Sequence, residues 1–286
     1  MSTTDLTPST TTQPPKNSGL SQVLNDTMII AWRNIRGGLR VPDTQIYMFI
    51  QPIMFVLLFA YVFGGAIQVP GAENIAGAYR EYLMAGIFVQ TMAFAVAPAS
   101  VGLADDMHKG LIDRFRSLPM ARSGVIAGRV VSDLASQFVV LIIMMICGLI
   151  VGWRVHNGVL PFLGGVGLML LFAFAMLWVG ALIGLSVGNP QVAASAGLIW
   201  LFPVVFLSNA FVPPESMPTV VRNIAEWNPI SALVAAARDL FGNQSIIVSD
   251  AWPMQNAVLA ALLWCVVIIG VFAPLAVRKY KAAASK

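Results

Sequence analysis

Charged residues are scarce in this sequence. Asp, Glu, Lys and Arg make up 10% of its 286 residues, whereas they make up about a quarter of a soluble globular protein. Hydrophobic residues reach 58%, and the mean hydropathy is +0.78. This balance excludes an ordinary soluble domain and indicates a polytopic membrane protein. The net charge of +4 is small and scattered, which argues against nucleic-acid binding.

Cysteine and histidine are also rare, with two residues of each. Cys147 and Cys265 each lie alone in an apolar segment, which argues against a disulfide framework and favours a packing role for both. His108 and His156 fall on opposite predicted sides of the membrane, so they are not expected to share a metal ion. We therefore predict no metal site in this chain.

Signatures of nucleotide binding and catalysis are missing as well. Gly164, Gly165 and Gly167 lie in an apolar segment without the Lys and the Ser or Thr that follow a phosphate-binding loop. The sequence has no HExxH motif, no paired catalytic carboxylates and no Ser, His and Asp set. An enzyme active site is not expected, so ATP hydrolysis, if it drives the process, belongs to a partner.

The N-terminal part changes in character near residue 20. Residues 1–19 are rich in Thr, Ser and Pro, which predicts a disordered cytoplasmic tail ahead of a membrane domain at residues 20–286. Residues 20–40 have a helical period, with Arg33, Arg36 and Arg40 on one side. The apolar arc holds Leu20, Leu24, Met28, Ala31, Trp32, Ile35 and Leu39. This predicts a helix in the membrane interface, and Trp32 favours that place over packing on cytoplasmic protein.

Six apolar segments are near the length of about 20 residues that hydrocarbon requires. We place these predicted spans at about 45–66, 82–104, 130–152, 160–187, 192–211 and 254–277. With the N-terminus inside, 13 of the 17 Lys and Arg residues fall in inner segments. This positive-inside bias predicts that both termini are cytoplasmic.

The central turns of these spans contain almost no charge. A transporter driven by protons or ions usually needs a carboxylate, His or Lys near the midplane, and the nearest candidate is Asp133. Arg129 lies four residues earlier, which favours a helix pair at the membrane interface instead. The energy for transport is therefore expected to come from elsewhere.

The most charged interruption is residues 105–129, the largest predicted cytoplasmic loop, with five of the 17 basic residues. If its first half is helical, two stripes run along it: Met107, Leu111, Phe115 and Leu118 are apolar, and Asp106, Lys109, Asp113 and Arg116 are charged. Pro119 predicts the end of this helix near Leu118. We interpret the segment as the element that receives mechanical work from a separate ATPase.

A second unusual region lies between the fifth and sixth spans, at residues 212–253. Pro218 suits the first turn of a short helix, Asn228 and Pro229 break it, and Gly242 stops a second helix after Phe241. Both helices are too short to cross hydrocarbon. They predict an interfacial or re-entrant hairpin on the outer side, with Ile224, Trp227, Leu233, Leu240 and Phe241 as apolar contacts. A plain extracellular loop is the alternative.

Three stretches match the pattern of a known family. They are Gly110, Leu111, Asp113, Arg114, Leu118 and Pro119 in the central loop; the run FLSNAFVPPESMP at 206–218; and Asn228, Pro229, Arg238 and Gly242. In these stretches the sequence resembles the ABC-2 type permeases, particularly their daunorubicin-resistance (DrrB-like) branch. The resemblance covers nearly all of the chain after residue 20. Asp105 and Asp106 stand where many relatives carry glutamates.

The resemblance implies an all-α polytopic membrane fold with six transmembrane helices. It makes residues 20–40 an amphipathic connecting helix, the central segment a cytoplasmic coupling helix, and Trp227, Asn228, Pro229 and Arg238 part of an extracellular re-entrant hairpin. Contact with the ATPase then involves Asp106, Lys109, Gly110, Asp113, Arg114 and Arg116. The implied assembly in a bacterial inner membrane has two P-loop ABC ATPase subunits, which bind ATP and Mg, and a second permease, either a copy or a paralogue.

The resemblance also implies export of amphipathic drugs, polyketides or complex lipids from the inner leaflet. Since the first, second and fifth spans lie near the permease interface in this family, we expect the path to include Gln51, Phe55, Gln90, Phe94, Trp200, Phe202 and Phe206. An amide in hydrocarbon needs a partner, whereas helix packing explains the aromatic residues equally well. The alternatives are a permease for polysaccharide or teichoic-acid precursors and a non-transporting membrane anchor for an ATPase.

Overall fold

The computed structural model describes residues 20–38, 42–58, 61, 78–110, 122–212, 214, 217–243 and 249–283. Every regular element within these ranges is a helix. In chain order they are α1 (Leu20–Gly38), α2 (Pro42–Leu57), α3 (Ala78–Ala93), α4 (Val96–His108), α6 (Arg122–Val151), α7 (Val159–Val187), α8 (Pro190–Ile199), α9 (Leu201–Phe206), α10 (Thr219–Trp227), α11 (Pro229–Phe241), α12 (Trp252–Gln255) and α13 (Ala257–Ala283). The predicted tail, residues 1–19, lies outside the described residues.

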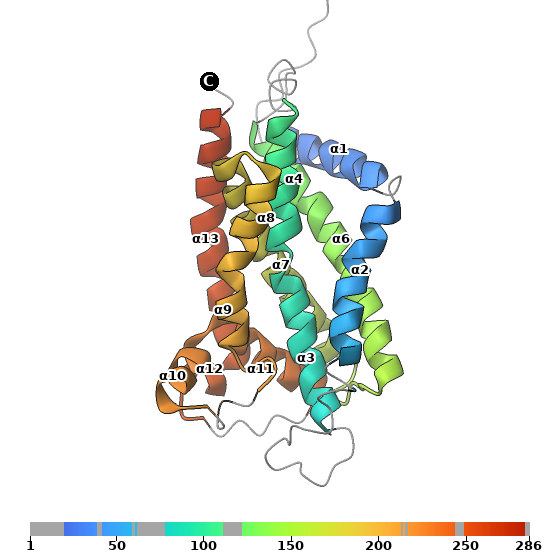
Figure 1. Cartoon of the computed structure of the whole chain (residues 1–286), viewed down its shortest axis with the longest axis vertical. Coiled ribbons are helices and arrows are strands. Elements are labelled where there is room, and N and C mark those ends of the chain that lie inside the picture. Colours follow the sequence, from blue (N-terminus) through green and yellow to red (C-terminus); the bar gives the residue numbers. More distant parts are fainter. Residues whose placement is uncertain are drawn as a thin grey trace, which may run out of the picture.

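The long helices run side by side and form a bundle with two distinct ends (Figure 1). At one end, here called the α1 end, helix α1 lies crosswise to the bundle near the C-terminus. At the other, the α10 end, the short helices α10, α11 and α12 gather. The prediction of an all-α fold is therefore confirmed for the described part of the chain.

Within the described residues, four helical segments are long and apolar enough to cross a membrane. They are Arg80–His108, Gly124–Val151, Val159–Val187 and Ala257–Ala282, and they correspond to the second, third, fourth and sixth predicted spans. The first and fifth predicted spans correspond to shorter helices. The first is α2, with 16 residues, and the fifth is α8 together with α9.

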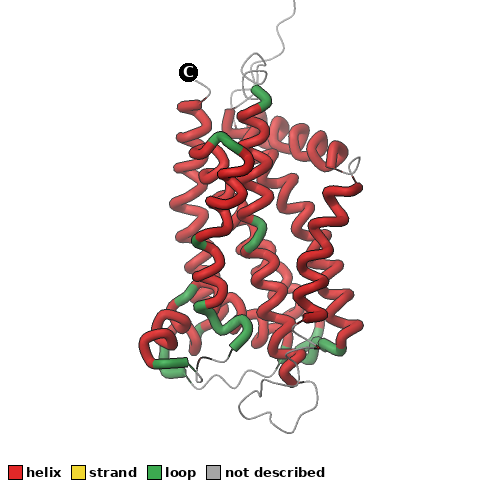
Figure 2. The backbone as a smooth tube through the Cα atoms, viewed as in Figure 1, coloured by secondary structure: helices red, strands yellow, loops and turns green. Residues whose placement is uncertain are grey.

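The second predicted span is not one continuous helix, because it is interrupted between α3 and α4 (Figure 2). Pro98 has no backbone N–H to donate to the carbonyl of Phe94, and its ring clashes with that carbonyl in a regular helix. The Phe94 carbonyl instead accepts a hydrogen bond from Ala97 N at 3.1 Å. The fifth predicted span is likewise divided, at Trp200, between α8 and α9.

Helix α7 is the centre of the bundle, and its glycines allow a close approach to α4. A Cβ atom on Gly180 would lie 2.5 Å from the Val96 carbonyl oxygen, and one on Gly184 would lie 2.4 Å from the Ser100 carbonyl oxygen. Both distances are too short for a real contact, so the two backbones meet directly at these positions. The GxxxG spacing of Gly180 and Gly184 therefore serves helix packing, as it does in many membrane bundles.

A substitution of Gly184 tests this contact. We expect Gly184→Val to destabilise the protein by about 3 kcal/mol, since the added atoms force α4 away from α7. Gly167→Val on the same helix is the matched control, because a Cβ atom there meets nothing within 4 Å. Thermal unfolding in detergent should show a lower midpoint for the first variant alone. Equal midpoints would show that the two helices are not packed as described.

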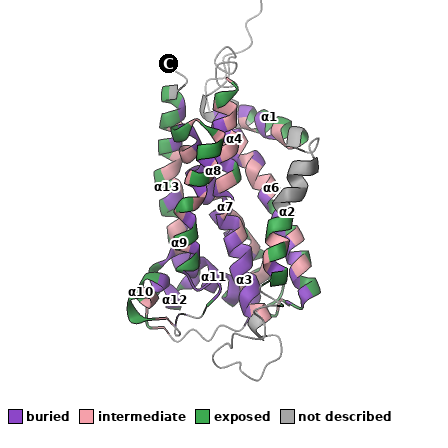
Figure 3. Ribbon diagram, viewed as in Figure 1, coloured by how far each residue is buried: buried purple, intermediate pink, exposed green. Residues whose placement is uncertain are grey.

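Burial separates an inner helix from an outer surface (Figure 3). Helix α3 is almost wholly buried from Tyr82 to Met92, and the core around it includes Phe88, Phe172 and Phe241. In contrast, α6 and α13 expose large apolar side chains such as Ile150 and Val266. An exposed apolar surface of this kind suits contact with lipid or with another apolar helix.

The two helices predicted in the outer region are present with the expected limits. Asn228 caps α11 by accepting a hydrogen bond from Ile230 N at 2.9 Å, and its side-chain amide donates to the Val204 and Leu207 carbonyl oxygens at 2.6 and 2.9 Å. Gly242 ends α11 with φ 72°. Asn228 therefore joins the start of α11 to the end of α9.

Arg238 ties three segments together at the α10 end and is fully buried, with 0% exposure. Its guanidinium donates to the carbonyl oxygens of Tyr82, Asn209 and Ala210 at 3.1, 3.0 and 3.3 Å. It also lies over the Tyr82 ring, 3.4 Å from the centroid. This predicted hairpin residue thus has a structural place between α3, α11 and the turn after α9.

Candidate functional site

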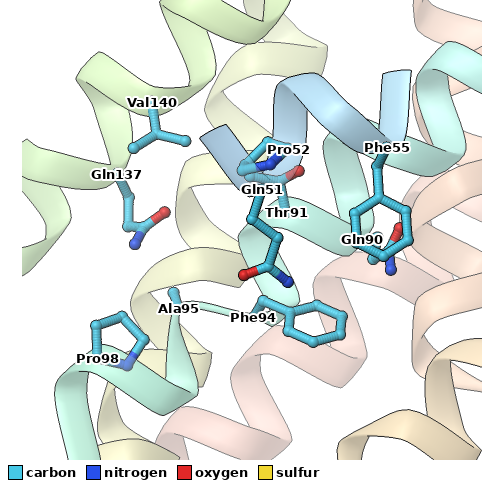
Figure 4. Close-up of a pocket in the computed structure, with 10 residues that line it drawn as sticks. All are labelled: Gln51, Pro52, Phe55, Gln90, Thr91, Phe94, Ala95, Pro98, Gln137 and Val140. Atoms are coloured by element: carbon cyan, nitrogen blue, oxygen red, sulfur yellow. The ribbon is translucent and has the colours of Figure 1, made fainter. Parts of the chain in front are cut away.

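A cavity of about 300 Å³ lies between α2, α3, α4 and α6 (Figure 4). It is lined by Gln51, Pro52, Phe55, Gln90, Thr91, Phe94, Ala95, Pro98, Gln137 and Val140. Four of these residues were predicted for the substrate path, namely Gln51, Phe55, Gln90 and Phe94. The structure brings these four together from two consecutive helices, with Gln51 and Phe55 on α2, Gln90 on α3 and Phe94 directly after α3.

Three glutamines and the Thr91 hydroxyl are the polar side-chain groups among the described residues that line this mostly apolar cavity. In Figure 4, Gln51 extends from α2 toward Phe94, with Gln137 of α6 on one side and Gln90 of α3 on the other. Gln90 is 3% exposed and Gln137 is 7% exposed, whereas Gln51 is exposed. Among the residues that the structure describes, the side chains of Gln90 and Gln137 have no hydrogen-bond partner. Neither amide is fully enclosed, so the donors and acceptors of both face the cavity and are available to a bound molecule.

Helix irregularities surround the cavity on two sides. Pro52 lies inside α2, Ala95 lies in the interruption between α3 and α4, and Pro98 lies in the first turn of α4. Within a membrane, irregular backbone is tolerated where it is buried in protein or lines a cavity. Discontinuous helices are also a frequent mark of binding sites in transporters. The interruptions therefore support this cavity as a functional site.

A row of aromatic rings leads from the cavity wall along α9. Phe94 contacts Phe202 edge to face with the ring centroids 5.3 Å apart. Phe202 stacks on Phe206 at 6.0 Å, and Phe206 contacts Phe211 at 5.6 Å. The predicted path residues Phe94, Phe202 and Phe206 thus form one contiguous set. Phe211 extends it and was not predicted.

Trp200, also predicted for the path, does not line this cavity. It borders a second cavity of about 330 Å³ between α7, α9, α11 and α13, together with apolar residues such as Phe172 and Ile268. Each helical residue turns the side-chain direction by roughly 100°, so Trp200 and Phe202 point to opposite sides of their segment. The two-residue spacing therefore explains why Trp200 and Phe202 face different parts of the bundle.

Gln137, Thr91, Pro52 and Pro98 were missed by the sequence-based prediction of the path. Gln137 had the same signal as Gln51 and Gln90, an amide within an apolar run, and that signal was sufficient to find it. The hydroxyl of Thr91 already donates to the Ile87 carbonyl oxygen at 2.8 Å. Gln137 is therefore the most useful of the missed residues, because it shows that α6 contributes a polar side chain to the cavity.

At the α1 end, an ionic cluster joins α4 to α6. The Arg129 guanidinium lies 2.7 Å from Asp106 Oδ2 and 3.2 Å from both carboxylate oxygens of Asp133. The predicted pair of Arg129 and Asp133 is present, and Asp106 is the additional partner. A Cβ atom on Gly102 would lie 1.9 Å from an Arg129 guanidinium nitrogen, so the absence of a side chain there makes room for the cluster.

The segment predicted for contact with an ATPase begins directly after this cluster. Helix α4 ends at His108, and Gly110 has a φ of 65°. The condition of one helix running on through Gly110 is not met, because this left-handed glycine follows the end of α4. Leu111, Phe115 and Leu118 lie outside the described residues. Lys109 lies in this turn, 2.6 Å from Asp105, whose hydrogen bond raises the pKa of the lysine. Asp113, Arg114 and Arg116 lie outside the described residues.

Helix α1 packs on the same end of α6. Its buried side includes Ile30 and Ala31, and a Cβ atom on Gly128 of α6 would lie 2.7 Å from the Thr27 carbonyl oxygen. Trp32 is 55% exposed and lies under the Arg36 guanidinium at 4.7 Å. The helix therefore has both a protein contact and an exposed apolar side, although the sequence favoured only the second. Arg33 is exposed, and Arg40 lies outside the described residues.

At the α10 end, the predicted apolar contacts divide into two groups. Leu233 and Phe241 of α11 are fully buried, whereas Ile224 and Trp227 of α10 are exposed, Trp227 by 59%. The two helices of this region therefore have different roles. Helix α11 belongs to the core, and α10 presents an apolar side outward.

Residues 25–241 match the family model described as ABC-2 type transporter. This match covers more than half of the chain. The chain belongs to the ABC-2 type transporter family. The matched range includes the cavity, the Arg129 cluster and the helices α10 and α11.

Individual members of the ABC-2 type transporter family support the same relationship. The chain is 30% identical over 257 residues to the daunorubicin resistance ABC transporter permease protein DrrB1 of Streptomyces coeruleorubidus, which covers 89% of this chain and 86% of that protein. It is 27% identical to the doxorubicin resistance ABC transporter permease protein DrrB of Mycobacterium tuberculosis, over 76% of this chain and 77% of the relative. Both relatives are permease subunits by name. The predicted resemblance to ABC-2 permeases of drug resistance is confirmed.

Proposed function

We propose that this chain is the permease subunit of an ATP-driven exporter that moves an amphipathic drug, polyketide or complex lipid outward from the inner leaflet. The observation that carries the proposal is the cavity between α2, α3, α4 and α6, where Gln51, Phe55, Gln90 and Phe94 meet. The names of its relatives, which are daunorubicin and doxorubicin resistance permeases, support a drug-like cargo.

The proposed topology has six spans in a bacterial inner membrane. Helix α2 serves as the first span, and α8 with α9 serves as the fifth. The positive-inside bias places the α1 end in the cytoplasm with both termini. The α10 end then faces outward, and its hairpin lies in the outer part of the membrane, with exposed Trp227 at the headgroup level.

The proposed energy source is a pair of P-loop ABC ATPase subunits that bind ATP and Mg. They contact the segment from Asp106 to Arg116, and a second permease, identical or paralogous, completes the assembly. The place of the Arg129 cluster supports this arrangement, because Asp106 at the start of the segment is bonded to Arg129 of α6, the helix that follows the segment. Displacement of the segment is thereby transmitted to both α4 and α6.

In this mechanism, ATP-driven closure of the ATPases moves the segment and tilts α4 and α6. Because α4 and α6 form two walls of the cavity, their tilt changes the cavity's shape and access. Cargo enters laterally from the inner leaflet, binds among the glutamines and phenylalanines, and leaves past the α10 end. The aromatic row along α9 offers contacts on that side.

A second candidate is a permease for polysaccharide or teichoic-acid precursors. The specific observation in its favour is the contiguous row of Phe94, Phe202, Phe206 and Phe211, since aromatic faces also bind sugar rings. The small volume of the cavity and its mostly apolar lining favour the first candidate. Competition by a lipid-linked sugar distinguishes the two candidate functions.

Transport by the assembled complex tests the proposal. The chain is purified with its partner ATPase and reconstituted in liposomes, and the uptake of daunorubicin is followed by fluorescence. Uptake is expected with ATP and not with a variant of the ATPase that lacks the P-loop lysine. Uptake by this chain alone, driven by an ion gradient, would refute the proposal, and competition by a lipid-linked sugar alone would support the second candidate.

The coupling segment gives a further prediction. Asp113→Ala combined with Arg116→Ala should lower cargo-stimulated ATP hydrolysis at least tenfold, because the two charged groups lie on the proposed contact with the ATPase. Membrane insertion should be unchanged, as measured by the yield of the folded chain in detergent. Arg278→Ala combined with Asp250→Ala is the matched control. Unchanged hydrolysis in the first variant would remove this segment from the ATPase contact.

A further inference from the structure

Gln90 and Gln137 form a polar pair that no part of the fold uses. Both are more than nine-tenths buried, and both line the same cavity from different helices. Their amide atoms are not among the fully enclosed polar atoms without a partner, so they remain accessible from the cavity. No other described residue forms a hydrogen bond with either amide. The two amides are therefore available to form hydrogen bonds with a bound cargo molecule.

We propose that this pair binds hydrogen-bonding groups of an uncharged, flat part of the cargo. The inference rests on the proposed function and names the chemistry that the cavity selects. An amide carries both a carbonyl acceptor and an NH₂ donor, so each glutamine pairs equally well with a hydroxyl or a carbonyl group. The cargo therefore has such groups on opposite edges of a planar body, one edge near α3 and one near α6.

The lining also decides against a charged group in the cavity. The ten described residues that line it include three amides and one hydroxyl and no charged side chain. A charge among apolar groups within the membrane is costly unless an opposite charge pairs with it. A cationic part of the cargo therefore stays outside the cavity, at the membrane surface, while the uncharged part enters.

The aromatic residues define the shape of the bound group. Phe55 and Phe94 both line the cavity, and Phe94 is held by its edge contact with Phe202. Ring faces favour offset stacking or edge contacts with another flat apolar body. Gln51 is exposed, so it lies where the cavity opens, and the two deeper amides determine specificity.

Two probes that share one planar ring system, and of which only one carries a cationic sugar, test the inference. Daunorubicin carries a cationic amino sugar, and its aglycone has the same ring system without charge. Equilibrium binding of each to the full chain in lipid nanodiscs, without ATP, is followed by probe fluorescence. We expect the two dissociation constants to agree within about threefold. Gln90→Leu and Gln137→Leu should each weaken binding of both probes about fivefold, which is the effect of one neutral hydrogen bond.

A charged substitution distinguishes a binding role of Gln137 from a purely structural one. It should change the ratio of the two dissociation constants only if Gln137 contacts the cargo. Gln137→Glu should raise the preference for daunorubicin over its aglycone at least tenfold, because a buried carboxylate attracts the cation. Gln255→Leu, at an exposed glutamine on α12, should leave both constants unchanged. Gln137→Met serves as the second variant if Gln137→Leu does not fold.

The outcomes are decisive in either direction. Equal binding by wild type and both leucine variants would overturn the inference, as would much tighter binding of the cation to the wild type. ATP-driven uptake with such a result would leave the proposed function intact. Conversely, glutamine-dependent binding without any ATP-driven uptake would support the cavity chemistry and refute the exporter.

Discussion

Arg129→Met should be among the most damaging single substitutions in this chain. It leaves Asp106 and Asp133 close together and half-buried, with no positive charge between them. Removing one partner of a buried ionic group typically costs 3 to 5 kcal/mol, and the partial exposure of this cluster places the expected loss at about 3 kcal/mol. Thermal unfolding of the purified chain should show a large fall in the midpoint.

The cluster is tested further by removing all of its charges. Arg129→Met combined with Asp106→Asn and Asp133→Asn should recover most of the lost stability, because no unpaired charge remains. Arg154→Met is the matched control, since Arg154 is exposed and bonds only backbone carbonyl oxygens among the described residues. If the triple variant were as unstable as Arg129→Met alone, the electrostatic explanation would be wrong.

Arg238→Leu should cause a comparable or larger loss at the opposite end. The variant removes this donor from the buried carbonyl oxygens of Tyr82, Asn209 and Ala210, of which Asn209 keeps a second donor, the Tyr82 hydroxyl at 3.1 Å. A buried acceptor that loses its partner costs about 1 to 3 kcal/mol, and the contact of the guanidinium with the Tyr82 ring is lost as well, so we expect a combined loss of about 4 kcal/mol. The expected observation is a low yield of folded protein and early thermal unfolding.

A lysine in place of Arg238 distinguishes the contribution of the positive charge from that of the guanidinium geometry. Arg238→Lys keeps the charge, but a single ammonium cannot span the three acceptors as a planar guanidinium does, so we expect at least half of the loss to persist. Arg278→Leu, an exposed arginine on α13, is the matched control and should be neutral. Full stability of Arg238→Lys would mean that the charge alone matters there.

The parts of the fold that depend on local chemistry were predictable from sequence. Asn228 and Pro229 begin α11 and Gly242 ends it, because capping groups and left-handed glycines act within a few residues. Gly110 carried the same local signal, but the apolar spacing from Met107 to Leu118 favoured a longer helix. At Gly110 the local signal agrees with the structure, because its φ of 65° follows the end of α4 at His108.

Features that depend on distant segments were not predictable in the same way. The packing of α1 on α6 requires the small Gly128 opposite Thr27, and nothing in either segment alone indicates that match. The fully buried state of Arg238 was missed for the same reason, because its acceptors come from two distant parts of the chain. For the cavity, an amide side chain within an apolar segment identified Gln51 and Gln90. Gln137 also lies in such a segment, but the sequence-based prediction did not include it.

The interruption at Phe94 and Ala95 has a mechanical consequence for the whole bundle. A continuous helix transmits a push at one end as a rigid rod, whereas a joint allows one arm to swing while the other stays still. Below this joint, Arg238 anchors the arm formed by α3. Above it, Arg129 fastens the arm formed by α4 to α6. The hinge point lies on the cavity wall itself, so a small swing of the upper arm acts first on the space where the glutamines lie.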